Sequence, residues 1–230
     1  MATARQFLLE GARVMVTGWN ENTLDRARQE LGREVPVVRI DAGKAGDQQL
    51  LRLRVEDTFG RLDVAVLNAG IGVFKPLEEW DEQSFNRSVD VNLKGPFFLM
   101  QALLPVLANP ASIVLTGSVN AHIGMATSSV YSATKAALRS LARTLSGELV
   151  SRGVRVNTLS PGPVATPIYR KLGLPDDALQ EMSQSLLKQL PAGRFADPVE
   201  IAHAAVFLAS DESAYAIGSE IVMDGGFTTL

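Results

Sequence analysis

The sequence predicts an α/β fold, a doubly wound parallel sheet with helices on both faces. Its apolar runs are continuous and rich in Val, Ile and Leu, as in strands that are covered on both faces. These runs alternate with amphipathic stretches of helical length, which favours a parallel sheet. The chain has 230 residues, 46% of them hydrophobic and 20% charged. We therefore expect one domain that spans residues 1–230 around a deep core.

Each element has its own local signal. The expected strands, taken from the β-branched runs, are 13–17, 35–40, 62–68, 112–117, 154–160 and 219–224. The expected helices are 2–10, 21–32, 47–59, 84–107, 129–151 and 198–209. Gly60 and Gly153 each follow a helix, where a left-handed capping residue is wanted. Asp197, Pro198 and Glu200 form a capping-box pattern that fixes the start of the last helix.

The segment 162–196 is the least regular part of the sequence. It holds four prolines around one short polar helix, whereas the rest of the chain alternates regularly between strand and helix signals. No repeat or linker divides the chain at this point. We expect the segment to form a loop or lid over the substrate.

Composition limits the classes of function. The formal net charge of −3 gives no electrostatic footprint for nucleic acid or an anionic membrane. No apolar run has the roughly 18 residues of a membrane span, and we expect no secretory signal. The chain has no cysteine, which is compatible with a cytoplasmic location. His122 and His203 lie far apart, so no metal site is expected.

Tyr131 and Lys135 carry the first chemical signal. They are four residues apart, so on a helix they share one face about one turn apart. A phenol with an ordinary pKa of about 10 is a poor base at neutral pH. A nearby ammonium group favours the phenolate and lowers that pKa. The pair is therefore expected to act as general acid in carbonyl reduction and as general base in alcohol oxidation.

Two further residues complete the constellation. Ser118 follows a predicted strand, where its hydroxyl can bind the reacting oxygen. Asn92 precedes Pro96, and because proline cannot donate to the helix ladder, we expect a local distortion there. A freed carbonyl and the Asn92 amide could then hold a water for proton relay. A lone Tyr-x-x-x-Lys is usually uninformative, whereas four suitable residues in this order indicate an enzyme.

On these residues the chain resembles the short-chain dehydrogenase/reductase family in its compact single-domain form. The matching pieces are Asn68-Ala69-Gly70, Asn92-Leu93-Lys94-Gly95, Ser118, Tyr131 with Lys135, Pro161 to Pro167, and Asp224-Gly225-Gly226. The resemblance covers nearly everything from residue 2 onward. It implies a Rossmann-like fold and hydride transfer between NAD or NADP and a small alcohol or ketone. It also implies a homo-oligomer, a tetramer or a dimer.

The resemblance also implies a role for each matching residue. Tyr131 would be the acid/base, and Lys135 would tune it and hold the nicotinamide ribose. Ser118 would orient the substrate, and Asn92 would hold a relay water. The residues implied to border the adenosine side are Asn68, Ala69 and Gly70, with Asp41 at the adenine. Those implied to line the nicotinamide are Pro161, Gly162, Val164 and Thr166.

One expected feature is missing from the sequence. Members of the family begin with a strand and a turn of the form Thr-Gly-x-x-x-Gly-x-Gly, which receives the pyrophosphate at a helix N-terminus. Residues 2–11 already read as the helix after that turn. In the family's sheet order, the missing strand lies between those predicted at 13–17 and 62–68. Three explanations stay open: a shortened reading frame, a rearranged sheet that binds cofactor poorly, or a partner segment that fills the gap.

The choice between NAD and NADP is not encoded in the usual way. An acid at the end of the second strand would hold the ribose of NAD, and a nearby arginine would favour NADP. Gly18 takes the position of the acid, and Trp19 stands where the family often has arginine. The prediction leans to NADP. The sequence does not identify the substrate. We interpret His122 as a polar loop residue rather than a substrate contact.

Two other functions stay open at this point. One is a subunit or scaffold that has the family's shape but binds cofactor poorly or catalyses nothing. The other is cofactor-free acid/base chemistry at Ser118 and Tyr131, as in halohydrin dehalogenases, which resemble this fold and use an arginine near the tyrosine. Lys135 argues against the second of these, because lysine is what the hydride-transferring enzymes carry.

Overall fold

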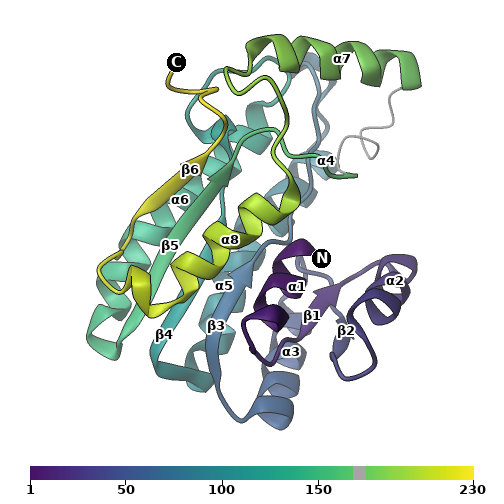
Figure 1. Cartoon of the computed structure of the whole chain (residues 1–230). Coiled ribbons are helices and arrows are strands. Elements are labelled where there is room, and N and C mark those ends of the chain that lie inside the picture. The colour runs from purple at the N-terminus through teal and green to yellow at the C-terminus, as the bar shows by residue number, and fades with distance from the viewer. Residues whose placement is uncertain (168–174) are drawn as a thin grey trace.

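The computed structural model describes residues 1–167 and 175–230. Its strands form two parallel sheets (Figure 1). The smaller sheet pairs β1 (Val16–Gly18) with β2 (Val37–Arg39). The larger has the order β3-β4-β5-β6, and its strands span Leu62–Leu67, Leu107–Thr116, Val154–Pro161 and Glu220–Met223. All pairs are parallel, as the sequence predicts.

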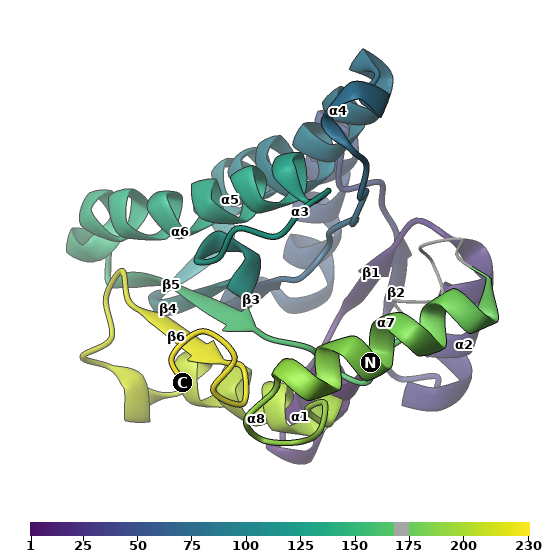
Figure 2. The same cartoon turned by 90° about the horizontal axis from the view of Figure 1, so that it is seen from above.

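Helices cover both faces of the larger sheet, so the arrangement is Rossmann-like (Figure 2). On one face lie α3 (Ala45–Phe59), α5 (Gly95–Leu103) and α6 (Ser129–Leu149). On the other, α1 (Ala2–Leu9) packs against α8 (Pro198–Ala209). The remaining helices are α2 (Glu21–Leu31), α4 (Glu82–Val89) and α7 (Asp176–Gln189).

The core follows from this layering. Ile113, Val114 and Leu115 in the middle of β4 have no exposed surface, because helices cover the strand on both sides. Ile113 and Leu115 belong to the larger apolar cluster, whereas Val114 points to the other face and packs with Leu208 of α8. Alternate residues of one strand therefore build two cores. None of the described helices is long and apolar enough to cross a bilayer.

The sheet is divided where the sequence lacks the family's first strand. Within the described residues, no ladder joins β1 to β3. The expected strand at 13–17 begins only at Val16, because Val16–Gly18 is the stretch that finds a partner in β2. The fourth expected strand starts earlier than predicted, at Leu107. The capping box expected before α8 is present, and the helix begins at Pro198.

The helix expected over 84–107 is broken in the structure. It consists of α4, a π-helical stretch at Asp90–Lys94, α5 and a short 3-10 turn. The predicted distortion near Pro96 is therefore confirmed, as one wide turn just before it. Helix α7 occupies part of the expected lid (Figure 1), while residues 168–174 of that segment lie outside the described part of the chain.

Candidate active site

The candidate site lies at the carboxyl ends of the central strands. β3 leads into Asn68, β4 into Ser118 and β5 into Gly162. Because parallel strands end at the same edge of a sheet, these segments share one rim. Open α/β sheets bind their ligands at such a rim. The topology therefore gathers residues that lie almost a hundred positions apart in the sequence.

Helix α6 brings Tyr131 and Lys135 to this rim. Lys135 is 4% exposed, and its Nζ donates a 2.7 Å hydrogen bond to the backbone carbonyl of Thr116, the last residue of β4. The same Nζ lies 5.7 Å from the centre of the Tyr131 ring. The shared helix face predicted from the spacing is therefore present. It holds an ammonium group beside a phenol at the end of the sheet.

Burial controls the ionisation of both groups. It lowers the pKa of Lys135 to about 8, because an apolar surrounding disfavours the charged amine. It raises the pKa of Tyr131 above its ordinary value, and the Ser118 side chain acts in the opposite direction. The pKa of Tyr131 is therefore raised and not lowered as expected, because desolvation outweighs the Ser118 hydrogen bond. At neutral pH the phenol is protonated, which is the form of a proton donor.

Ser118 stands at the start of the loop that follows β4. Its hydroxyl accepts a hydrogen bond from the backbone N–H of Asn120 at 3.2 Å and lies 3.3 Å from the Asn120 amide oxygen. The side chain is 7% exposed. These contacts fix the hydroxyl at the strand end, on the same rim as Tyr131.

Asn92 lies inside the π-helical turn and is almost fully buried. Its Nδ2 donates to the backbone carbonyl of Ile71, and its Oδ1 accepts from the backbone N–H of Ile71, both at 2.8 Å. Nδ2 also lies 3.4 Å from the hydroxyl of Thr134, which itself donates to the Tyr131 carbonyl. The Asn92 amide thus joins the loop after β3 to α6. The predicted water relay would have to share an amide that already holds Ile71.

The residues expected to border a dinucleotide lie along the same rim or close to it. A Cβ at Gly70 would sit 3.4 Å from Asn92 Oδ1 and 3.5 Å from Lys135 Nζ, so the bare backbone faces both groups. Asn68 accepts a 3.2 Å hydrogen bond from the Thr116 hydroxyl. Ala69 lies between them. The Gly70 backbone therefore packs closely against Asn92 and Lys135, with Asn68 tied to the end of β4.

Asp41 follows β2 and is held by an ion pair. Arg87 lies 3.1 Å from its Oδ1, and the backbone N–H of Gly43 donates to the same carboxylate. These partners keep the pKa of Asp41 below its ordinary value even though burial opposes them. The carboxylate is charged and fixed, but it lies with the smaller sheet.

The segment after β5 forms the other wall. The N–H of Gly162, just after Pro161, donates to the Met223 carbonyl, and a Cβ at Gly162 would come within 2.7 Å of Asp224 Cα. Only glycine permits this close approach. Val164 bridges to Ala196, and the Thr166 N–H donates back to Val164.

Two features of the site were not anticipated. Phe74 packs on Tyr131, with ring centroids 5.5 Å apart. His122, expected to be a polar loop residue, lies 2.7 Å from Glu220, which also accepts from Ser160 and faces Arg139. The one sequence signal for the second feature was a carboxylate at the start of an otherwise apolar strand, at Glu220. For Phe74 there was none.

The residues that the resemblance implies for the nicotinamide end, Lys135, Gly70 and the 161–166 segment, lie on this rim. The Lys135 ammonium is a hydrogen-bond donor, and a donor of this kind suits the hydroxyls of a ribose. The turn Thr-Gly-x-x-x-Gly-x-Gly does not occur in the 230 residues. The chemistry of the residues present therefore fits the nicotinamide end of a dinucleotide.

Comparison with known proteins agrees with this geometry. A family model described as enoyl-(acyl carrier protein) reductase matches residues 1–228. Oxidoreductase asL5 of Sarocladium schorii is 36% identical over 100% of this chain and 91% of its own. The NADP-dependent (R)-specific alcohol dehydrogenase of Lentilactobacillus kefiri is 34% identical over 99% and 91%.

The chain belongs to the short-chain dehydrogenase/reductase family. A solved member from Brucella melitensis, titled a short-chain dehydrogenase/reductase of the glucose/ribitol dehydrogenase type, superposes with a TM-score of 0.92. It is 32% identical and covers 100% of this chain and 91% of that one. The predicted class, an NAD(P)-dependent oxidoreductase, is confirmed at the level of this family.

Proposed function

We propose that the protein transfers hydride between the nicotinamide of NADP or NAD and a secondary alcohol or ketone, with Tyr131 as general acid/base. The observation that carries the proposal is the pairing on α6. A partly buried, protonated phenol lies beside the Ser118 hydroxyl and one helical turn from a buried lysine. The alcohol specificity named for the Lentilactobacillus kefiri relative supports an alcohol or ketone substrate.

Each side chain has a distinct task in this scheme. The cofactor supplies or accepts the hydride at the carbonyl carbon. In reduction, the Tyr131 hydroxyl gives its proton to the carbonyl oxygen, and in oxidation it takes that proton back. The Ser118 hydroxyl hydrogen-bonds the same oxygen and orients it. Overall, one hydride and one proton are added to the ketone, which leaves the alcohol.

Lys135 and Asn92 act around the phenol. Lys135 stabilises negative charge as the phenol gives up its proton, because its ammonium lies over the ring. It would also hold the nicotinamide ribose across Gly70. Asn92 holds the Ile71 backbone in place and completes a relay to solvent through a bound water. These are positioning and electrostatic roles that leave the hydride step to the cofactor.

The remaining assignments complete the proposal. Asn68, Ala69 and Gly70 border the adenosine side, with Asp41 at the adenine, and Pro161, Gly162, Val164 and Thr166 line the nicotinamide. NADP is the favoured cofactor, since Gly18 offers no acid to the ribose and the named alcohol dehydrogenase relative is NADP-dependent. The protein acts as one domain over residues 1–230, with 162–196 closing on the substrate, in a cytoplasmic homo-oligomer that is a tetramer or a dimer.

A matched pair of tyrosine variants tests the catalytic assignment. Tyr131→Phe removes only the hydroxyl, so we expect it to lower kcat by at least about 100-fold, the usual contribution of a positioned acid. Tyr215→Phe makes the same change at a fully exposed side chain and should leave kcat unaltered. The assay is NADPH oxidation at 340 nm with a methyl ketone. Undiminished turnover in Tyr131→Phe would falsify the assignment.

A second candidate function is that of a subunit or scaffold that has the fold of the family but does not catalyse hydride transfer. The observation that favours it is the division of the sheet, because no ladder joins β1 to β3 in the described residues. Titration with NADPH distinguishes the two, read from the fluorescence of Trp19, which is 59% exposed. Saturable quenching supports the enzyme, and no response up to millimolar NADPH supports the subunit.

A further inference from the structure

A short strap, residues 71–75, crosses the rim beside Tyr131 and is anchored at both ends. At one end, Asn92 binds both the N–H and the C=O of Ile71 at 2.8 Å. At the other, the Lys75 N–H donates to the Thr127 carbonyl at 2.9 Å, and the Trp80 Nε1 donates to the Lys75 carbonyl at 3.2 Å. The backbone of the strap is therefore set by its surroundings before any substrate arrives.

The anchors at Lys75 are themselves tied into the fold. The Lys75 ammonium lies 2.8 Å from Asp81, the residue that caps α4. Thr127, which accepts the backbone bond, has a left-handed backbone with φ of 66°. A non-glycine residue adopts this conformation only where its surroundings require it. Both the strap and the loop opposite it are thus held in one arrangement.

Phe74 is the side chain that this strap presents to the site. Its ring packs on the ring of Tyr131 at 5.5 Å between centroids, tilted by 49°. A Cβ at Gly72 would come within 2.7 Å of the Phe74 ring, so the ring lies against bare backbone and glycine leaves room for it. Phe74 is 38% exposed, so it contacts Tyr131 and still has accessible surface for another apolar group.

This placement has a consequence for what can react. The carbonyl oxygen of a substrate must come within hydrogen-bond reach of the Tyr131 hydroxyl. A substituent on the carbonyl carbon then lies next to the ring that packs on Tyr131. An aromatic ring with a free face gains contact with a flat apolar group and offers nothing to a hydroxyl.

We propose that Phe74 is a specificity-determining residue, a fixed aromatic wall that selects ketones and secondary alcohols with a flat apolar substituent over those with a hydroxylated one. The proposal rests on the proposed function, because it concerns the substrate of the same site. It adds the substrate class, aryl or cycloalkyl rather than polyol.

The test uses two methyl ketones that differ only in the second substituent. Acetophenone carries a phenyl group and hydroxyacetone a hydroxymethyl group. Reduction of each by NADPH gives a ratio of kcat/KM values. In Phe74→Ala the ratio should fall about 10-fold, as expected for loss of one aromatic contact, with hydroxyacetone changing about 2-fold or less. Phe74→Trp should keep the ratio within about 3-fold of the wild type.

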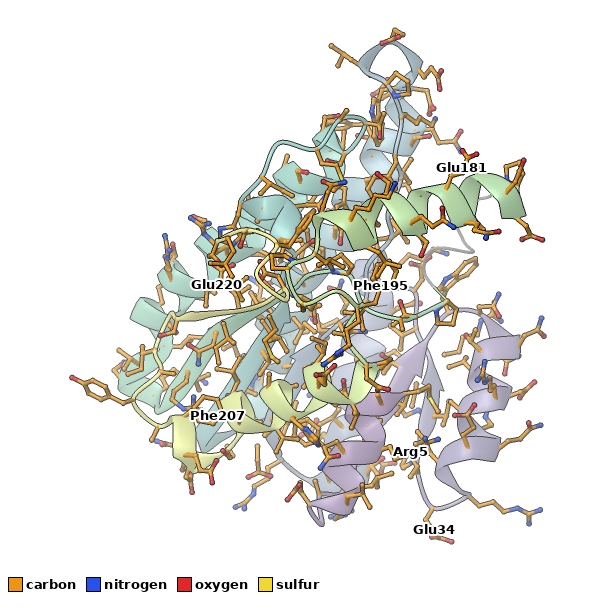
Figure 3. All side chains as sticks on the ribbon, turned by 45° about the horizontal axis from the view of Figure 1, so that its top comes forward. Arg5, Glu34, Glu181, Phe195, Phe207 and Glu220 are labelled. Carbon is orange, nitrogen blue, oxygen red and sulfur yellow. The ribbon has the colours of Figure 1, made fainter. Side chains whose placement is uncertain are left out.

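A matched control excludes general effects of removing a phenylalanine. Phe207 on α8, labelled in Figure 3, is 40% exposed, close to the value for Phe74. Helix α8 covers the face of the sheet opposite to α6, which carries Tyr131 (Figure 2). Phe207→Ala should leave the ratio unchanged. An unchanged ratio in Phe74→Ala, or an equal loss with both ketones, would overturn the proposal.

A binding measurement separates this proposal from the proposed function. Saturation-transfer NMR detects acetophenone on the protein without turnover. If the wild type reduces neither ketone, no ratio can be measured, and the binding result alone decides the role of Phe74. If the acetophenone signal is lost in Phe74→Ala and kept in Phe207→Ala, the result supports the role of Phe74 as an aromatic wall of the substrate site. Retention in both variants overturns it.

Discussion

Replacing Lys135 by methionine should make the protein more stable and inactive at once. The side chain is 4% exposed, and burial lowers its pKa from 10.5 to about 8. One pKa unit corresponds to about 1.4 kcal/mol, so holding the buried ammonium costs about 3 kcal/mol of folding free energy at pH 7. Methionine fills a similar space without charge but loses the hydrogen bond to the Thr116 carbonyl, at about 1.5 kcal/mol for a charged donor. Lys135→Met should therefore gain about 1.5 kcal/mol of unfolding free energy at pH 7.

The stability difference between Lys135→Met and the wild type should depend on pH. Because the folded-state pKa of Lys135 is lowered, the unfolded chain binds more protons between about pH 8 and 10.5. The wild type is therefore stabilised as pH rises through that window, and the cost of the charge disappears above it. The gain in unfolding free energy of Lys135→Met over the wild type should be largest at pH 7 and should be gone by about pH 10.

Urea unfolding followed by tryptophan fluorescence measures both quantities. Lys94→Met is the matched control, since its side chain is 54% exposed and pairs with Asp90 one turn away. Its free energy of unfolding should change by less than about 0.5 kcal/mol. A Lys135→Met protein that is less stable than the wild type at pH 7 would refute the reasoning. So would a gain that is the same at both pH values.

Three further predictions concern the pH dependence of activity and two glycines. Ketone reduction should lose kcat/KM above about pH 8, as the ammonium of Lys135 is deprotonated and its pKa is about 8, and a profile that stays flat to about pH 10 would contradict the electrostatic role. Gly95→Ala should cost about 1–3 kcal/mol of unfolding free energy in urea, because its Cβ would overlap the Ala42 carbonyl oxygen. Gly147→Ala, in the last turn of α6 with open space around it, should add about 0.5 kcal/mol of unfolding free energy, and a loss of stability in Gly147→Ala would contradict the expected effect of helix propensity.

The bounds of a helix could be predicted from the sequence where a local capping motif marks its end. Helix α8 has the expected bounds because its capping box and proline act within one turn. The helix expected over 84–107 was wrong in detail, since apolar spacing does not distinguish a π-helical turn from an α-helical one. The strand expected from Arg13 starts at Val16, because a strand extends only as far as its partner does.

The site shows the same limit. The order and spacing of Ser118, Tyr131 and Lys135 carried enough information to predict that they gather on one rim. The hydrogen-bond partners of Lys135 and Asn92 could not be predicted in this way. They are the Thr116 carbonyl and the Ile71 backbone, and every residue possesses such groups. The direction of the Tyr131 pKa shift also depends on burial, which no spacing encodes.

The division between the two sheets bears on how the protein opens. In the described part of the chain, no ladder hydrogen bond joins β1 to β3, and the smaller sheet meets the rest through side chains such as Ile40, Leu51 and Val55. Separating β1 and β2 from the body breaks apolar contacts while it leaves every rung of the larger ladder intact. We therefore expect the part that contains β1 and β2 to open at a lower free energy than the larger sheet. Hydrogen exchange should then be faster for the amide protons of β1 and β2 than for those of β4 and β5.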